Sequence, residues 1–103
     1  MKENDVTESE IFDDSATRVV EMGNTIMEQK GDEMIWAIAS GMLAGAIQFW
    51  LYSRQPCEDP SCEDCTPYST AELRQEELME EVMQFIVSSE YLHSPNDRDV
   101  GKA

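Results

Sequence analysis

A run of nineteen residues from Met34 to Tyr52 contains no charged side chain, and it constrains the fold of this chain more than any other segment. Its order is MIWAIASGMLAGAIQFWLY. Other parts of a protein or a lipid bilayer must cover a segment this apolar, because removing apolar surface from water is favourable. Arg54 and Pro56 end the run, so we expect one helix over residues 33–54, with Asp32 as its cap.

The segment before the run is predicted to form an amphipathic helix over residues 8–30. Thr7 and Glu10 have the spacing of a capping box, and Gly31 suits the end of a helix because glycine tolerates a positive φ. At about 100° per residue, one face collects the apolar and small side chains of Phe12, Ala16, Val19, Val20, Gly23, Ile26 and Met27.

The segment after the run divides into a loop and a third helix. Residues 56–68 hold three of the four prolines and all three cysteines, which predicts a loop. Ser69 and Glu72 repeat the capping-box spacing, and we expect a helix over residues 70–92. Its apolar face carries Ala71, Leu78, Val82, Phe85, Ile86, Ser89 and Leu92, and its acidic face carries Glu76, Glu77, Glu80, Glu81 and Gln84.

These segments predict an all-α fold of three helices. A chain of 103 residues has room for one small core, so we expect a single helical domain over residues 8–93. Residues 1–7 and 94–103 are expected to be disordered. In this fold the two amphipathic helices pack against the hydrophobic central helix.

The central helix also meets the usual criteria for a membrane span. Trp36 and Trp50 lie near its ends, and Gly41 and Gly45 form a GxxxG pair. The run is short for a span and is diluted by glycine, alanine, Ser40 and Gln48. We favour a protein without a membrane span, because both flanking helices have apolar faces that the central helix could cover. A single-span membrane protein with its span at 34–52 is the alternative.

A stripe of small or polar side chains follows one side of the central helix. We call it the small-residue stripe: Ala37, Ser40, Gly41, Ala44, Gly45 and Gln48. Small side chains let two helix backbones approach closely, so the stripe is the predicted interface with a second copy of the chain or with a partner. In the alternative interpretation, the stripe admits one of the flanking helices of the same chain.

The charge of the chain restricts its partners. Seven Lys and Arg stand against 22 Asp and Glu, which gives a formal net charge of -15 and argues against direct binding of nucleic acid. The charged start of the chain does not resemble a secretory signal, and an odd number of cysteines suits a reducing compartment, so we expect the cytoplasm.

The cysteines Cys57, Cys62 and Cys65 form the one pattern that resembles a metal site. A fourth ligand would have to be His93 or a carboxylate of the loop. The acidic neighbours Glu58, Asp59, Glu63 and Asp64 disfavour free thiolates. We therefore favour unreactive loop cysteines, with no metal and no cofactor, and keep zinc as the alternative.

The remaining polar residues predict no catalysis. His93 has no Ser or Cys nucleophile at a recognisable spacing, and the glutamates of the third helix are interpreted as a solvated face. The expectation is a non-enzymatic protein that binds another protein through apolar helical surface with acidic margins. The alternative is an acidic DNA mimic that occupies the cleft of a nucleic-acid-binding protein.

The order of segments resembles the small anti-activators of bacterial quorum sensing. The shared layout is an amphipathic helix, an apolar Ala/Gly helix at 34–52, a cysteine loop and an acidic helix at 70–92. The resemblance covers the helical body and rests on no motif. It implies a dimer that binds the ligand-binding domain of a LuxR-type transcriptional activator, blocks its dimerisation and so prevents its binding to DNA. It transfers no functional residue.

Overall fold

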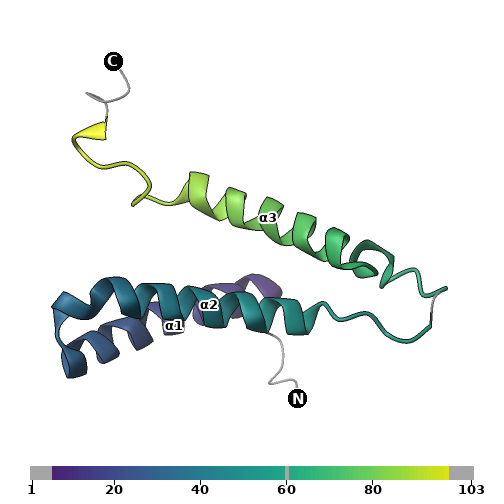
Figure 1. The fold of residues 1–103 in the computed structure, drawn as a ribbon, viewed down its shortest axis with the longest axis horizontal. Helices are drawn as coiled ribbons and strands as arrows, with labels where there is room; N and C mark the ends of the chain where they lie inside the picture. The colour runs from purple at the N-terminus through teal and green to yellow at the C-terminus, as the bar shows by residue number, and fades with distance from the viewer. Residues whose placement is uncertain (1–5, 60, 98–103) are drawn as a thin grey trace. The chain divides into compact units, whose positions relative to one another are not determined.

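The computed structural model describes residues 6–59 and 61–97, and within these ranges it is all-α, with three α-helices and no strand (Figure 1). The elements are α1 (Glu8–Lys30), the 3₁₀ turn η1 (Asp32–Met34), α2 (Ile35–Ser53), the 3₁₀ turn η2 (Thr66–Tyr68) and α3 (Ala71–Ser88). The predicted fold class of three helices is confirmed. The chain divides into two compact units, 1–49 and 50–103. The single domain over residues 8–93 stays a prediction.

Both predicted ends of α1 form as their sequence signals indicate. Thr7 Oγ1 accepts the amide of Glu10 at 3.1 Å, and Glu10 Oε1 accepts the amide of Thr7 at 3.1 Å, which completes the capping box. At the other end Gly31 has φ 99° and its amide donates to the Met27 carbonyl at 2.8 Å. A side chain is strained at this φ, so glycine is required at this turn.

Helices α1 and α2 form a hairpin that turns at Gly31 (Figure 1). The two helices pack closely at Gly23, because a Cβ placed there would lie 2.9 Å from Met42 Sδ. The half-buried side chains Ile26, Met27, Ile38 and Met42 lie around this point. Among the described residues no side chain is fully buried, so the hairpin has no enclosed core of its own.

The start of α2 differs from its prediction. Asp32 does not cap the helix but lies inside η1, and the α-helix begins at Ile35. Gly31 precedes η1 and offers no side chain to cap it, so the Met34 amide bonds instead to the Gly31 carbonyl at 3.1 Å. The chain therefore enters α2 through a tight 3₁₀ turn.

The ends of α3 also differ from their predictions. Thr70, and not Ser69, is the N-cap, and its hydroxyl accepts the Leu73 amide at 3.1 Å. The helix ends at Ser88 and not at residue 92. Ser89 is extended and its hydroxyl accepts the amide of Tyr91 at 3.1 Å. A short hydroxyl side chain competes with helical hydrogen bonds in this way, which explains the early end.

A turn follows at the end of the described chain. The amide and hydroxyl of Ser94 donate to the Asp97 carboxylate at 2.8 and 3.1 Å. The predicted disorder of residues 1–5 and 98–103 lies outside the described residues.

Candidate functional site

The α1–α2 hairpin of the first unit exposes apolar surface along both of its helices. A groove runs on either side of the line where the two helices meet, and four residues of that line, Val19, Ile38, Met42 and Ala46, border both grooves. Nearly all the surface in the two grooves is apolar. Each helix therefore turns its apolar face toward the other without enclosing it.

The first groove, which we call the stripe groove, contains half of the small-residue stripe. Ala37, Gly41 and Gly45 line it together with side chains of α1. Ser40, Ala44 and Gln48 are exposed elsewhere on α2. The whole predicted interface is thus on accessible surface, but only three of its residues face α1.

Open space lies above the two glycines of the stripe. A Cβ placed at Gly41 or at Gly45 would have no atom within 4 Å, whereas one at Gly23 would strike Met42. Gly41 and Gly45 therefore make no close contact with α1. The small residue that permits the contact between the two helices is Gly23 of α1, which sequence analysis had placed only on an apolar face.

The second groove is lined by larger side chains. Val20, Gly23 and Met27 of α1 face Ile35 and Leu43 of α2 across it. Val20 is 62% exposed and Leu43 58% exposed. These values are high for core side chains, so the second groove is an uncovered apolar surface of this unit.

The stretch Asp32–Ser53, taken as one helix of 22 residues, is long and apolar enough to cross a bilayer, and none of it is buried. It is the one stretch of residues 6–59 and 61–97 that meets this test. This property rests on length and composition alone, and the core helix of a soluble protein or a signal sequence can share it.

A polar and aromatic cluster holds the second unit together. Trp50 Nε1 donates to Glu81 Oε1 at 3.0 Å, and the same oxygen lies 3.7 Å from Arg54 Nη2. The Arg54 guanidinium covers the Trp50 ring at 4.2 Å and lies 5.8 Å from the Tyr68 ring. Arg74 Nη1 donates to the Tyr68 carbonyl at 2.7 Å. The cluster thus ties the end of α2, η2 and α3 to one another.

Glu81 therefore does not belong to a solvated acidic face, and that prediction is corrected for this residue. It is half-buried and bonded to both Trp50 and Arg54. Part of this cluster could be predicted from the sequence. Trp50 and Arg54 are four residues apart, a spacing that brings two side chains together on one face of a helix. The helical spacing of the glutamates does not reveal which of them meets that face.

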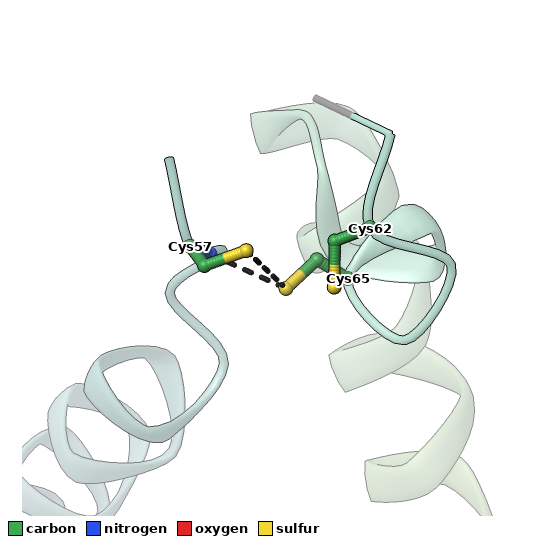
Figure 2. A group of neighbouring side chains, drawn as sticks. All are labelled: Cys57, Cys62 and Cys65. Atoms are coloured by element: carbon green, nitrogen blue, oxygen red, sulfur yellow. Dashed lines mark hydrogen bonds between the residues drawn. The ribbon is translucent and has the colours of Figure 1, made fainter. Parts of the chain in front are cut away.

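The three cysteines come together in the loop between α2 and α3. Figure 2 shows Cys57 on one stretch of the loop and Cys62 with Cys65 on another, with their sulfur atoms gathered between the two stretches. All three Sγ atoms lie within 4.8 Å of one another, and those of Cys57 and Cys65 are 3.5 Å apart. The Cys57 amide also donates to Cys65 Sγ at 3.2 Å. The structure holds them as free thiols.

The surroundings of Cys57 and Cys65 shift the pKa values of the two thiols in opposite directions. Hydrogen bonds with the Asp59 backbone and then with the other two cysteines lower the pKa of Cys57. The Cys57 amide acts to lower the pKa of Cys65, but hydrogen bonds to the other two thiols, desolvation and the charge of Cys57 together raise it.

His93 is not a neighbour of this cluster. It follows α3, whereas the cysteines precede it, and an 18-residue helix is about 27 Å long. His93 Nδ1 lies 3.9 Å from Asp97 Oδ2 instead. His93 is thus excluded as a fourth ligand within the same chain.

Comparison with known protein families, with curated proteins and with solved structures finds no match for this chain.

Proposed function

We propose that this chain is a non-enzymatic regulator that binds another protein through the apolar surface of the α1–α2 hairpin. The observation that carries the proposal is the pair of open apolar grooves on either side of the helix contact. Each buried Å² of apolar surface stabilises a complex by about 25 cal/mol before the costs of association. A protein surface that covers these grooves is therefore strongly favoured.

The acidic side chains of α1 favour a protein partner, and not a lipid bilayer, as the cover of the apolar grooves. Helix α1 packs close to Met42, near the middle of the Asp32–Ser53 stretch, since a Cβ placed at Gly23 would lie 2.9 Å from Met42 Sδ. Glu21 and Glu28 belong to α1 and would enter a bilayer together with the hairpin. Inside a membrane each of these carboxylates would cost about 2.5–3.5 kcal/mol. The hairpin would have to open before α2 could insert.

We further propose that the small-residue stripe of α2 forms a homodimer contact and so completes the packing of the central helix. All six of its residues are exposed, and the space above Gly41 and Gly45 is open. A second helix could approach the α2 backbone there more closely than at Leu43 or Phe49.

The narrower form of the proposal is a cytoplasmic anti-activator that blocks the dimerisation of a LuxR-type transcriptional activator. Its support is the resemblance of the three-helix layout to quorum-sensing anti-activators. An apolar helical surface with acidic margins suits a helical dimerisation surface with basic edges.

Partner binding is tested with two charge-matched variants of α1. Val20→Asp places a carboxylate in the second groove, and Thr17→Asp places one on the polar face of the same helix. A partner captured by the full chain is purified, identified and titrated against both variants. We expect Val20→Asp to weaken binding at least about tenfold, because a buried unpaired carboxylate is costly, and Thr17→Asp to leave it unchanged. Equal affinities would contradict the proposed surface.

The homodimer is tested with Gly41→Leu and Gly45→Leu. Neither side chain meets an atom of its own chain at its Cβ, so both variants are expected to fold. Overpacking an interface costs about 1–3 kcal/mol, which shifts a dimer equilibrium by about fivefold to a hundredfold or more. Sedimentation over a concentration series, with circular dichroism as the control for folding, measures the shift. A monomeric wild type, or folded variants that dimerise as well as wild type, would contradict this interface.

A single-span membrane protein is the second candidate, and the length and apolarity of Asp32–Ser53 favour it. Fractionation of cells that express the full chain separates the two functions. A protein-binding regulator is recovered in the detergent-free supernatant. Recovery only in a membrane fraction that resists carbonate extraction would establish the span instead.

A further inference from the structure

We propose that Cys57, Cys62 and Cys65 form a zinc site in which three thiolates from the α2–α3 loop hold one Zn²⁺ ion. This site goes beyond the proposed protein-binding function and does not depend on it. The residues that carry it lie in the loop, whereas the grooves of the hairpin are lined by residues 19–46.

The distances between the sulfur atoms match a thiolate zinc site. Two Zn–S bonds of about 2.3 Å at a tetrahedral angle place their sulfur atoms about 3.8 Å apart. The Sγ atoms of Cys57 and Cys65 are 3.5 Å apart, and no pair of the three is farther apart than 4.8 Å. Side-chain rotations that move a sulfur atom by about 1 Å therefore suffice to bring all three around one ion.

The backbone of the loop explains why the three thiols converge. The Cys62 amide donates to the Asp59 carbonyl at 3.1 Å, and Ser61 donates its amide and hydroxyl to Asp59 Oδ1 at 3.0 and 2.8 Å. After Cys62, the Thr66 hydroxyl donates to the Cys62 carbonyl at 3.1 Å. These bonds form turns on both sides of Cys62 that bring Cys62 and Cys65 to the same side of the loop, facing Cys57 (Figure 2).

The fourth position of the ion has space for an oxygen ligand. Cys57 is exposed, Cys62 and Cys65 are half-buried, and the hollow beside them is also lined by Glu58, Asp59, Thr66 and Ser69. Zinc completes four-coordination with carboxylate oxygen or water. A carboxylate that lines this hollow, or water, would occupy the fourth position.

The charge of the loop favours a cation at this point. Residues 55–73 contain no Lys or Arg, and Glu58, Asp59, Glu63 and Asp64 surround the cysteines in sequence. These carboxylates disfavour a free thiolate, which argued for inert cysteines from the sequence alone. They attract a bound Zn²⁺ ion, however, and the ion neutralises the charge of two of the three thiolates, so the zinc-bound state is favoured over the metal-free thiolates.

The site is tested by metal titration of the full chain under reducing, oxygen-free conditions, after a thiol assay has confirmed three free thiols per chain. Co²⁺ serves as the spectroscopic probe. We expect thiolate-to-cobalt charge-transfer absorption and tetrahedral visible bands that saturate at one Co²⁺ per chain, and we expect one equivalent of Zn²⁺ to abolish them. Affinity should fall as the pH is lowered, because protons compete for the thiolates.

Four variants make the assignment specific. Cys57→Ser, Cys62→Ser and Cys65→Ser should each weaken zinc binding at least about a hundredfold, since loss of a ligand exceeds the 10–100-fold effect of losing a residue that only supports one. Ser69→Ala changes the same hollow without removing a thiol and should bind zinc as wild type does. No charge-transfer band with three free thiols, saturation at one ion per two chains, or retained affinity in any Cys→Ser variant would each overturn the single-chain site. None of these results bears on the groove variants Val20→Asp and Thr17→Asp.

Discussion

Glu81 has surroundings unlike those of the neighbouring glutamates on α3. It accepts a hydrogen bond from Trp50 and pairs with Arg54, whose guanidinium lies over the Trp50 ring. Its side chain is 35% exposed, so solvent screens part of this interaction. At the scale of single residues, the stability of the second unit depends on a few such polar contacts, because no described side chain is fully buried.

Replacing Glu81 by Ala is expected to lower the free energy of unfolding by about 1 kcal/mol, since it removes one hydrogen bond and one partly screened ion pair. Glu80→Ala, on the exposed side of the same helix, should change it by less than about 0.5 kcal/mol. Urea unfolding measured by Trp50 fluorescence in a Trp36→Phe background tests both. If the two variants are equally stable, the Trp50–Glu81–Arg54 contacts contribute nothing.

The pKa of the Asp97 carboxyl group indicates whether the turn at Ser94–Asp97 is formed, because Ser94 donates two hydrogen bonds to this carboxylate. The Ser94 amide, then the Ser94 hydroxyl and to a smaller extent His93 lower the pKa of Asp97. A lowered pKa in the folded state means that the turn is favoured at neutral pH and is lost as the pH falls through that lowered pKa. We expect Ser94→Ala to raise the pKa of Asp97 part of the way to its ordinary value, and Ser89→Ala to leave it where it is. An NMR titration of the Asp97 carboxyl measures this. An unchanged pKa in Ser94→Ala would contradict the turn.

The element on which the first unit depends most is the turn between α1 and α2. Gly31 has a positive φ of 99° that side chains rarely adopt, whereas Gly41 and Gly45 lie in the helix with open space at their Cβ positions. The same Gly→Ala change should therefore have opposite effects at these two kinds of position.

Gly31→Ala is expected to destabilise the hairpin by about 1–3 kcal/mol, because alanine is strained at that φ. At concentrations at which the chain is monomeric, Gly41→Ala is expected to stabilise it by up to about 1 kcal/mol, because alanine has the higher helix propensity. Thermal unfolding followed by circular dichroism compares the two variants with wild type. A Gly31→Ala variant as stable as wild type would show that the Gly31 conformation does not limit the stability of the turn.

The whole molecule combines a strong negative charge with an uncovered apolar surface. Two copies at a net charge of -15 each repel one another, so the homodimer that we propose depends on apolar contact. Binding to a basic partner has the opposite electrostatic sign, since the two charges attract.

Salt is therefore expected to strengthen the homodimer and to weaken binding of a basic partner, because it screens repulsion in the first case and attraction in the second. Sedimentation of the homodimer and titration of the purified partner, each at low and at physiological ionic strength, measure the two trends. A partner complex whose affinity falls steeply with salt while Val20→Asp has no effect would favour the DNA mimic over the apolar binding surface.

Local sequence signals predicted the helices well because they act within a few residues. The Thr7–Glu10 capping box and Gly31 set the two ends of α1, and the all-α class follows from the helical spacing of apolar residues. The end of α3 was missed because the apolar pattern continues to Leu92, whereas the Ser89 hydroxyl diverts the backbone after Ser88. Hydrophobic spacing carries no information about such a competing hydrogen bond.

The acidity of this protein, its three helices and its uncovered apolar helix follow from composition and short-range spacing along the chain. The contacts between distant residues do not. Gly23, and not Gly41 or Gly45, lies close to the neighbouring helix, Glu81 bonds to Trp50 and Arg54, and the sulfur atom of Cys57 lies near those of Cys62 and Cys65. Each of these depends on which residues meet across a turn or a loop. The direction in which the chain folds back decides which residues meet, and the periodicity of the sequence does not encode that direction.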